Sequence, residues 1–185
     1  MRFANLPDAR SALVVLVPEA EPMVGALRER FDPSAKVGVP AHVTVLFPFV
    51  PPEQWSDAVM AAVADAIRGV DAFDFRLSKV GRFPATAYLV PEPAAPFVAL
   101  TQRVVERFPG HAPYGGAHAD IIPHLTVADR DAANAAVAAA ALDARLQTDG
   151  AIASTCRRVT LLEDSSGVWR EVRSFELAPV EIGVG

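Results

Sequence analysis

The chain has 185 residues, of which 51% are hydrophobic and 21% are charged, and its formal net charge is -5 at pH 7. This length and composition are typical of one globular domain and exclude a disordered chain. The acidic balance excludes a protein that coats long RNA or DNA by counterion release, because that mode of binding needs many basic side chains.

Three further features limit the setting. No run of about 18 apolar residues exists that could cross a membrane. The first apolar stretch is only six residues long and ends at Pro18, so we expect no signal peptide. Cys156 is the only cysteine, which excludes an intrachain disulfide and a cysteine-based zinc cluster. We therefore expect a cytoplasmic protein, and a monomer.

The first half of the chain alternates predicted strands and helices. Alternating β-branched and aromatic residues indicate strands, and an acidic start with a basic end or a proline start with a glycine stop indicates helices. The predicted elements are, in order, a strand at 11–18, a helix at 19–31, a loop at 32–41, a strand at 42–49, a helix at 51–70 and a strand at 73–83.

The second half repeats this order. The predicted elements are a strand at 86–91, a helix at 95–108, a loop at 109–123, a strand at 124–129, a helix at 130–146, a strand at 154–164 and a last strand at 168–180. Each half thus reads strand, helix, strand, helix, strand, which indicates an internal duplication.

This pattern predicts a single α+β domain over 1–185 with two lobes. Lobe 1 covers about 11–80, lobe 2 covers about 86–164, and a closing strand runs over 168–180. We expect each lobe to contain a mainly antiparallel sheet with two helices, and the lobes to be related by a pseudo-twofold axis with a cleft between them.

One short motif occurs at the same place in each half. The first copy is HVTV at 42–45 and the second is HLTV at 124–127. Side chains two residues apart on a strand share a face. His42 and Thr44 therefore share one face, and so do His124 and Thr126. If the two halves pack as equivalent lobes, these faces meet across the cleft.

Two imidazoles and two hydroxyls around one small volume suit in-line attack at phosphorus. One histidine accepts a proton from the nucleophile and the other donates a proton to the leaving oxygen, since the unperturbed histidine pKa of roughly 6.5 lies near working pH. The threonine hydroxyls can donate to the non-bridging oxygens, where charge builds in the transition state. This chemistry needs no metal and no cofactor.

Two HxT motifs about eighty residues apart, each opening a strand in a duplicated α+β lobe, resemble the two-histidine (2H) phosphoesterase superfamily. More narrowly, the chain resembles the bacterial 2′-5′ RNA ligase-like branch. Its similar segments include HVTVLFPF, VGRFPATAYLVP (80–91), PYGGAHADIIPHLTVAD (113–129) and WREVRSFEL (169–177). The resemblance implies a bilobal, metal-free enzyme acting on 2′,3′-cyclic or 2′-5′ phosphodiester bonds, by hydrolysis or reversible ligation.

The same resemblance implies roles for the two histidines. His42 would be the proton donor and His124 the acceptor, and these roles exchange in the reverse reaction. Nothing in the residues themselves fixes that direction. The family's RNA-handling members carry basic residues around the cleft, whereas this chain is acidic, which favours a small nucleotide or an RNA end over long RNA as the partner.

Four further residues are candidates for substrate binding. Arg130 follows the second motif and could reach a phosphate, although a solvated charge at a helix start is an equal reading. Arg82 near the lobe junction has a similar status. Phe47 and Tyr114 could stack a base, as could Phe83, Tyr88 and Trp169, but core packing explains such residues more simply, with Tyr114 in its glycine-rich loop the best exception.

Two other readings stay open. His118, Asp120 and His124, with His111 nearby, could be read as a metal site, but their spacing matches no familiar zinc motif. A chain that kept the fold without turnover would be a binding module for a nucleotide or an RNA end. Both histidines and both threonines are intact, which favours the enzyme.

Overall fold

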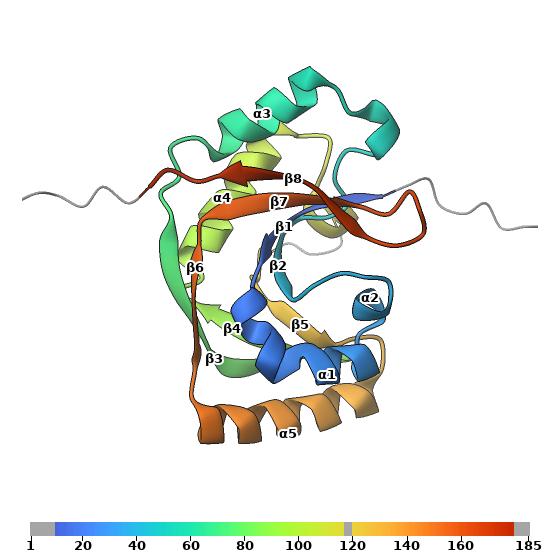
Figure 1. Ribbon diagram of the computed structural model, residues 1–185, viewed down its shortest axis with the longest axis vertical. Coiled ribbons are helices and arrows are strands. Elements are labelled where there is room, and N and C mark those ends of the chain that lie inside the picture. Colours follow the sequence, from blue (N-terminus) through green and yellow to red (C-terminus); the bar gives the residue numbers. More distant parts are fainter. Residues whose placement is uncertain (1–9, 117–119, 180–185) are drawn as a thin grey trace, which may run out of the picture.

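Two four-stranded antiparallel sheets form the frame of the molecule, as described for residues 10–116 and 120–179 by a computed structural model (Figure 1). The strands are β1 (Ser11–Leu16), β2 (His42–Leu46), β3 (Phe73–Phe83), β4 (Thr86–Glu92), β5 (Leu125–Ala128), β6 (Ile152–Cys156), β7 (Arg158–Glu163) and β8 (Arg170–Glu176). The first sheet has the order β2-β1-β7-β8 and the second has the order β5-β4-β3-β6. The predicted two-lobe α+β fold is confirmed.

Within the described residues, five helices and three short 3-10 turns connect the strands. The helices are α1 (Glu21–Phe31), α2 (Pro33–Lys36), α3 (Asp57–Ile67), α4 (Ala95–Arg107) and α5 (Ala132–Asp149), and the turns are η1 (Pro18–Ala20), η2 (Pro52–Gln54) and η3 (Pro113–Gly116). None of the helices in the described part of the chain is long and apolar enough to cross a membrane.

Neither sheet is built from one contiguous half of the chain. A two-residue turn, Pro84-Ala85, joins β3 to β4 as a hairpin, so β3 lies in the second sheet although it ends the first half. In the same way β7, which ends the second half, pairs with β1 in the first sheet. The lobe boundary that we expected near residue 80 therefore falls inside β3.

The single strand predicted at 154–164 is wrong, because β6 and β7 lie in different sheets. The chain turns at Arg157, which belongs to neither strand, and passes from the second sheet to the first.

One helix prediction and one loop prediction also differ from the structure. The helix predicted at 51–70 begins only at Asp57, where Ser56 caps it by accepting a hydrogen bond from the Val59 N–H. The preceding prolines lead into η2 instead of a first helical turn. The loop predicted at 32–41 contains α2, whose N-cap is the Asp32 side chain.

The helices exchange places between the halves. The first-half helix α1 packs with α5 on the second sheet, and the second-half helix α4 packs with α3 on the first sheet (Figure 1). The buried Thr101 hydroxyl of α4 donates to the Val45 carbonyl of β2 at 2.9 Å. This interlock brings the edge strands β2 and β5 into contact at the junction of the sheets.

Candidate active site

The first HxT motif alternates between the core and a cavity along β2. Val43 and Val45 point into the core and are 0% and 2% exposed. His42 and Thr44 are only partly buried and line the cavity on the other face. The hydrophobic effect fixes this register, because a one-residue slip would expose both valines.

The second motif has the same arrangement at β5. Leu125 and Val127 are fully buried, and Thr126 between them is partly exposed. His124 directly precedes the strand. All four residues, His42, Thr44, His124 and Thr126, line a single cavity of about 1310 Å³ at the junction of the sheets.

Both imidazoles are held by the same local hydrogen bond. Nδ1 of His42 lies 2.7 Å from the Pro40 carbonyl oxygen, and Nδ1 of His124 lies 2.6 Å from the Ile122 carbonyl oxygen. A carbonyl only accepts, so Nδ1 carries the proton in each ring. In the neutral imidazole Nε2 is then the basic atom, the one that can accept a proton from a substrate or from water.

The surroundings of His42 favour its neutral form. Burial is the largest cause and lowers the pKa of His42 from 6.5 to about 4. The nearby charges of Arg28 and His124 also lower this pKa, while the hydrogen bond to Pro40 and the carboxylate of Asp32 raise it. At neutral pH the His42 imidazole is therefore uncharged.

Aromatic rings pack against the other histidine. The His124 ring centroid lies 5.4 Å from Phe83 and 5.2 Å from Tyr88, and these two rings are 4.6 Å apart. Tyr88 lies on β4 opposite Gly81 of β3, and a Cβ on Gly81 would come within 2.2 Å of the Tyr88 ring. The glycine leaves the space that the tyrosine occupies beside His124.

The four predicted substrate-binding residues have different positions. Phe47 and Arg130 line the cavity, and the Arg130 side chain is 76% exposed with its Nε 3.8 Å from a carboxylate oxygen of Asp129. Arg82 is not among the lining residues and donates to the Ala132 carbonyl at 3.3 Å. The side chain of Tyr114 lies outside the described part of the structure.

Trp169, Arg10 and Asp32 also line this cavity, although the sequence pattern does not predict them there or indicates only core packing. Trp169 from the β7–β8 turn packs edge-on against Phe47 with ring centroids 6.1 Å apart. Arg10 lies 5.6 Å above the Trp169 ring and pairs with Asp164 at 2.8 Å. Asp32 is 2% exposed and also lines the cavity. Arg10 and Trp169 are far from both motifs in the sequence, and Asp32 precedes the first motif by ten residues, so no local pattern indicates them.

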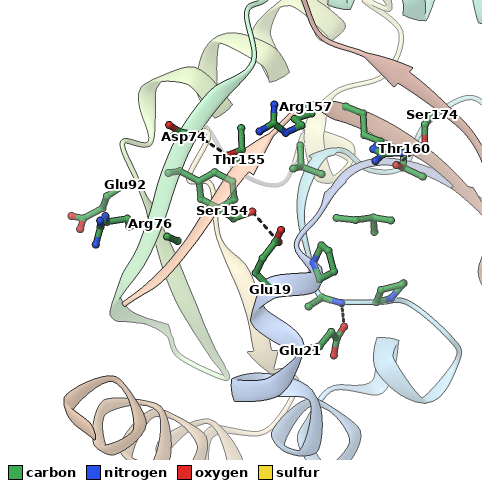
Figure 2. Close-up of a pocket in the computed structure, with 18 of the residues that line it drawn as sticks. Glu19, Glu21, Asp74, Arg76, Glu92, Ser154, Thr155, Arg157, Thr160 and Ser174 are labelled. Atoms are coloured by element: carbon green, nitrogen blue, oxygen red, sulfur yellow. Dashed lines mark hydrogen bonds between the residues drawn. The ribbon is translucent and has the colours of Figure 1, made fainter. Parts of the chain in front are cut away.

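A second cavity of about 1100 Å³ lies beside η1, β3 and the β6–β7 crossing, and none of the four motif residues lines it (Figure 2). Two of its carboxylates already accept hydrogen bonds from hydroxyl groups. Ser154 donates to Glu19 at 3.0 Å, and Thr155 donates to Asp74 at 2.6 Å. Acidic and basic side chains are mixed along its walls, which selects no single class of ligand.

The described residues offer no set of ligands for the metal site considered at His118, Asp120 and His124. Within 10–116 and 120–179, no three His, Cys, Asp or Glu side chains gather where they could hold a metal ion. His118, one of the three residues of that reading, lies outside the described residues. His111 packs beside Phe49 and Phe108, with ring centroids 6.1 and 6.4 Å away.

Solved structures share this fold. The chain is similar to Escherichia coli LigT complexed with NADP⁺, with 16% identity, a TM-score of 0.57, and coverage of 92% of this chain and 98% of LigT. LigT complexed with 3′-AMP is 15% identical to this chain with a TM-score of 0.59, and the match covers 91% of this chain and 97% of LigT. The protein TT0787 of Thermus thermophilus is 17% identical to this chain with a TM-score of 0.59, and the match covers 93% of this chain and 100% of TT0787.

Among curated proteins no match to the chain is found. A model of the 2′-5′ RNA ligase superfamily matches residues 16–167, which include both HxT motifs and all the strands except β8 and β1, of which only the last residue is included. The match covers most of the chain, and the fold agrees with it. The chain therefore belongs to the 2′-5′ RNA ligase superfamily of phosphoesterases.

Proposed function

We propose that the protein is a metal-free phosphodiesterase that acts on 2′,3′-cyclic phosphates or 2′-5′ phosphodiester bonds, with His42 and His124 as its acid–base pair. The observation that carries this proposal is that both HxT faces line one cavity, with each imidazole anchored through Nδ1. A structural role for either histidine alone would not require this paired arrangement.

The reaction follows from the two anchored rings. One neutral imidazole takes a proton from water through Nε2 as the water oxygen bonds to phosphorus. The other, protonated, gives its proton to the leaving ribose oxygen as that P–O bond breaks. The hydroxyls of Thr44 and Thr126 donate to the non-bridging oxygens, where the negative charge grows. The product is a phosphomonoester with a free ribose hydroxyl.

The direction of proton transfer is open to test. Because burial keeps His42 neutral, this residue is suited to accept the first proton, opposite to the role that the resemblance implies. A phosphate anion bound beside it would raise its pKa and favour the donor role. In ligation the two roles exchange, so one site serves both directions.

The partner that we propose is a small nucleotide or an RNA end, handled by a cytoplasmic monomer without a cofactor. LigT has been seen with NADP⁺ and with 3′-AMP, which supports a nucleotide ligand. Phe47 and Trp169 offer ring faces for a base, and Arg130 offers a charge for a phosphate. Long duplexes do not suit an acidic surface.

The test is a panel of 2′,3′-cyclic nucleotides, 2′-5′ dinucleotides and cyclic-phosphate-ended RNA, read by product chromatography with and without EDTA. We expect turnover of at least one class, unchanged by the chelator. Activity that is lost in EDTA and restored by zinc would contradict the proposal. Tight binding of these ligands with no product would favour the binding module instead.

A further inference from the structure

A buried ion pair lies beside the first motif. Arg28, in the last turn of α1, and Asp32, its C-cap residue, are each only 2% exposed. The Arg28 guanidinium donates to one Asp32 carboxylate oxygen from Nε at 3.1 Å and from Nη2 at 2.9 Å. Removing two charges from water is costly, so a buried pair is weak evidence for a purely stabilising role.

The pair is tied to the segment that leads into His42. The second oxygen of Asp32 accepts hydrogen bonds from the Ser34 N–H at 2.9 Å and the Ser34 hydroxyl at 2.8 Å. On the other side, Arg28 Nη1 lies 3.9 Å from a Glu21 carboxylate oxygen. That same oxygen accepts the N–H of Ala41 at 2.6 Å, a bond drawn in Figure 2.

The two charges face His42 with opposite effects. Asp32 lines the cavity of His42, whereas Arg28 lies behind it and is not among the lining residues. Arg28 lowers the pKa of His42, Asp32 raises it, and His124 across the cavity lowers it. Because the pair is buried, salt in the solvent screens its field little.

The second motif is built differently. His124 packs against the rings of Phe83 and Tyr88. The ion pair nearest to it in sequence joins Arg130 Nε to an Asp129 carboxylate oxygen at 3.8 Å, and both side chains are exposed. The two histidines therefore share one local anchor but differ in the groups packed around them. A difference of this kind is what separates acid from base in paired catalytic groups.

We propose that Arg28 and Asp32 are positioning residues for the first motif: their buried ion pair, tied to Ser34 and through Glu21 to Ala41, holds the segment that leads into His42 and keeps one charge of each sign beside that ring. This inference rests on the proposed acid–base function of His42 for its meaning. Its test, however, is a property of the unliganded protein and needs no turnover.

The experiment is an NMR titration of His42 in the full chain, with its signal assigned by its loss in His42→Gln. Two charge-removing variants keep a hydrogen-bonding side chain, Arg28→Gln and Asp32→Asn. We expect Arg28→Gln to move the His42 titration to higher pH by about one unit, and Asp32→Asn to move it to lower pH. Arg28→Lys keeps the charge and should titrate like the wild type.

A structural role alone would not shift the two variants in opposite directions. If both folded variants shift the same way, or if neither shifts, the proposal is wrong. Folding is checked by near-UV circular dichroism, since an unpaired buried charge can cost about 3–5 kcal/mol. Should Arg28→Gln fail to fold, the test compares Asp32→Asn with Arg28→Lys. The proposal is supported if His42 titrates at lower pH in Asp32→Asn and at the wild-type pH in Arg28→Lys. Any other result overturns it.

Discussion

Two residues of the same type, anchored in the same way, are given different surroundings in this molecule. His42 lies beside a buried pair of opposite charges and His124 lies beside two aromatic rings. Sequence alternation is enough to predict that each histidine shares a face with its threonine. It cannot predict the surroundings, because Arg28, Asp32 and Tyr88 are brought to the site by tertiary packing and not by local spacing.

The first prediction concerns the four motif residues. His42→Ala and His124→Ala should each lose about 10²–10⁴-fold in kcat, because general acid and general base act in the same transition state. The double variant should lose less than the product of the two losses, since residues acting as a unit are not additive. Thr44→Ala or Thr126→Ala should lose less than either histidine variant, because the second hydroxyl remains.

Steady-state kinetics on a cyclic nucleotide measures these losses, with circular dichroism as the check on folding. Thr44→Ser and Thr126→Ser are the matched controls, because they keep the hydroxyl and should retain most activity. If either His→Ala variant folds and keeps a kcat within a few-fold of the wild type, the two-histidine mechanism is wrong.

The second prediction concerns pH. Burial lowers the pKa of His42 to about 4, so it stays neutral down to that pH and protonates only below it. If His42 accepts the proton, the acid limb of kcat/KM should lie near pH 4 and not near the ordinary value of about 6.5, because kcat/KM reports the free enzyme. The acid limb of kcat should lie at higher pH, since bound phosphate raises this pKa.

Initial rates from about pH 3.5 to about pH 9, with stability at each pH checked by preincubation, give both profiles. A kcat/KM that falls steadily as pH rises above about 4 would instead assign His42 as the proton donor.

At the scale of elements, hydrogen bonding between distant segments decides what the local pattern leaves open. The pattern at 73–83 predicts β3 with its observed bounds. At 154–164 it fails, because Arg157 carries no turn signal such as proline or glycine, and only the pairing of β6 with β3 and of β7 with β1 separates the two strands. The prolines at 51 and 52 are typical of a helix start, but here they lead into η2.

The third prediction belongs to the β3–β4 hairpin. Gly81→Ala places a Cβ within 2.2 Å of the Tyr88 ring, so the ring must move, and it packs against His124. We expect overpacking to cost about 1–3 kcal/mol in unfolding free energy. We also expect kcat to fall by up to about 10²-fold, because small misplacements of a catalytic group are costly.

Gly110→Ala is the matched control, since no atom lies within 4 Å of a Cβ at that position. Thermal unfolding and kcat are measured for both variants. Reduced stability of Gly81→Ala with an unchanged kcat would mean that Tyr88 does not position His124.

At the scale of the whole molecule, the two halves depend on each other for their sheets. The first half supplies β1 and β2 to the first sheet and β3 to the second sheet. The second half supplies β4, β5 and β6 to the second sheet and β7 to the first sheet. The duplication itself is readable from the repeated order of elements. The exchange of strands and helices is not, because nothing local records which sheet a strand joins.

The fourth prediction follows from this dependence. Fragments 1–84 and 85–185, cut at the β3–β4 turn, should each fail to fold alone, because each would expose unpaired strand edges and uncovered apolar faces. Mixed together, they should restore the dispersed NMR spectrum of the intact chain. A dispersed spectrum from fragment 1–84 alone would contradict the interlock.

The exchange of α1 and α4 between the two sheets also bears on how such a chain can arise. Swapping one element between two identical copies is a low-cost route to a dimer. A half-length ancestor that swapped its first helix and last strand would pair as a twofold dimer, with one HxT motif from each copy meeting at the axis. Joining the copies in one gene frees the two histidines from the twofold symmetry that would make their surroundings identical, and the separate surroundings of His42 and His124 are a consequence that only the fused chain permits.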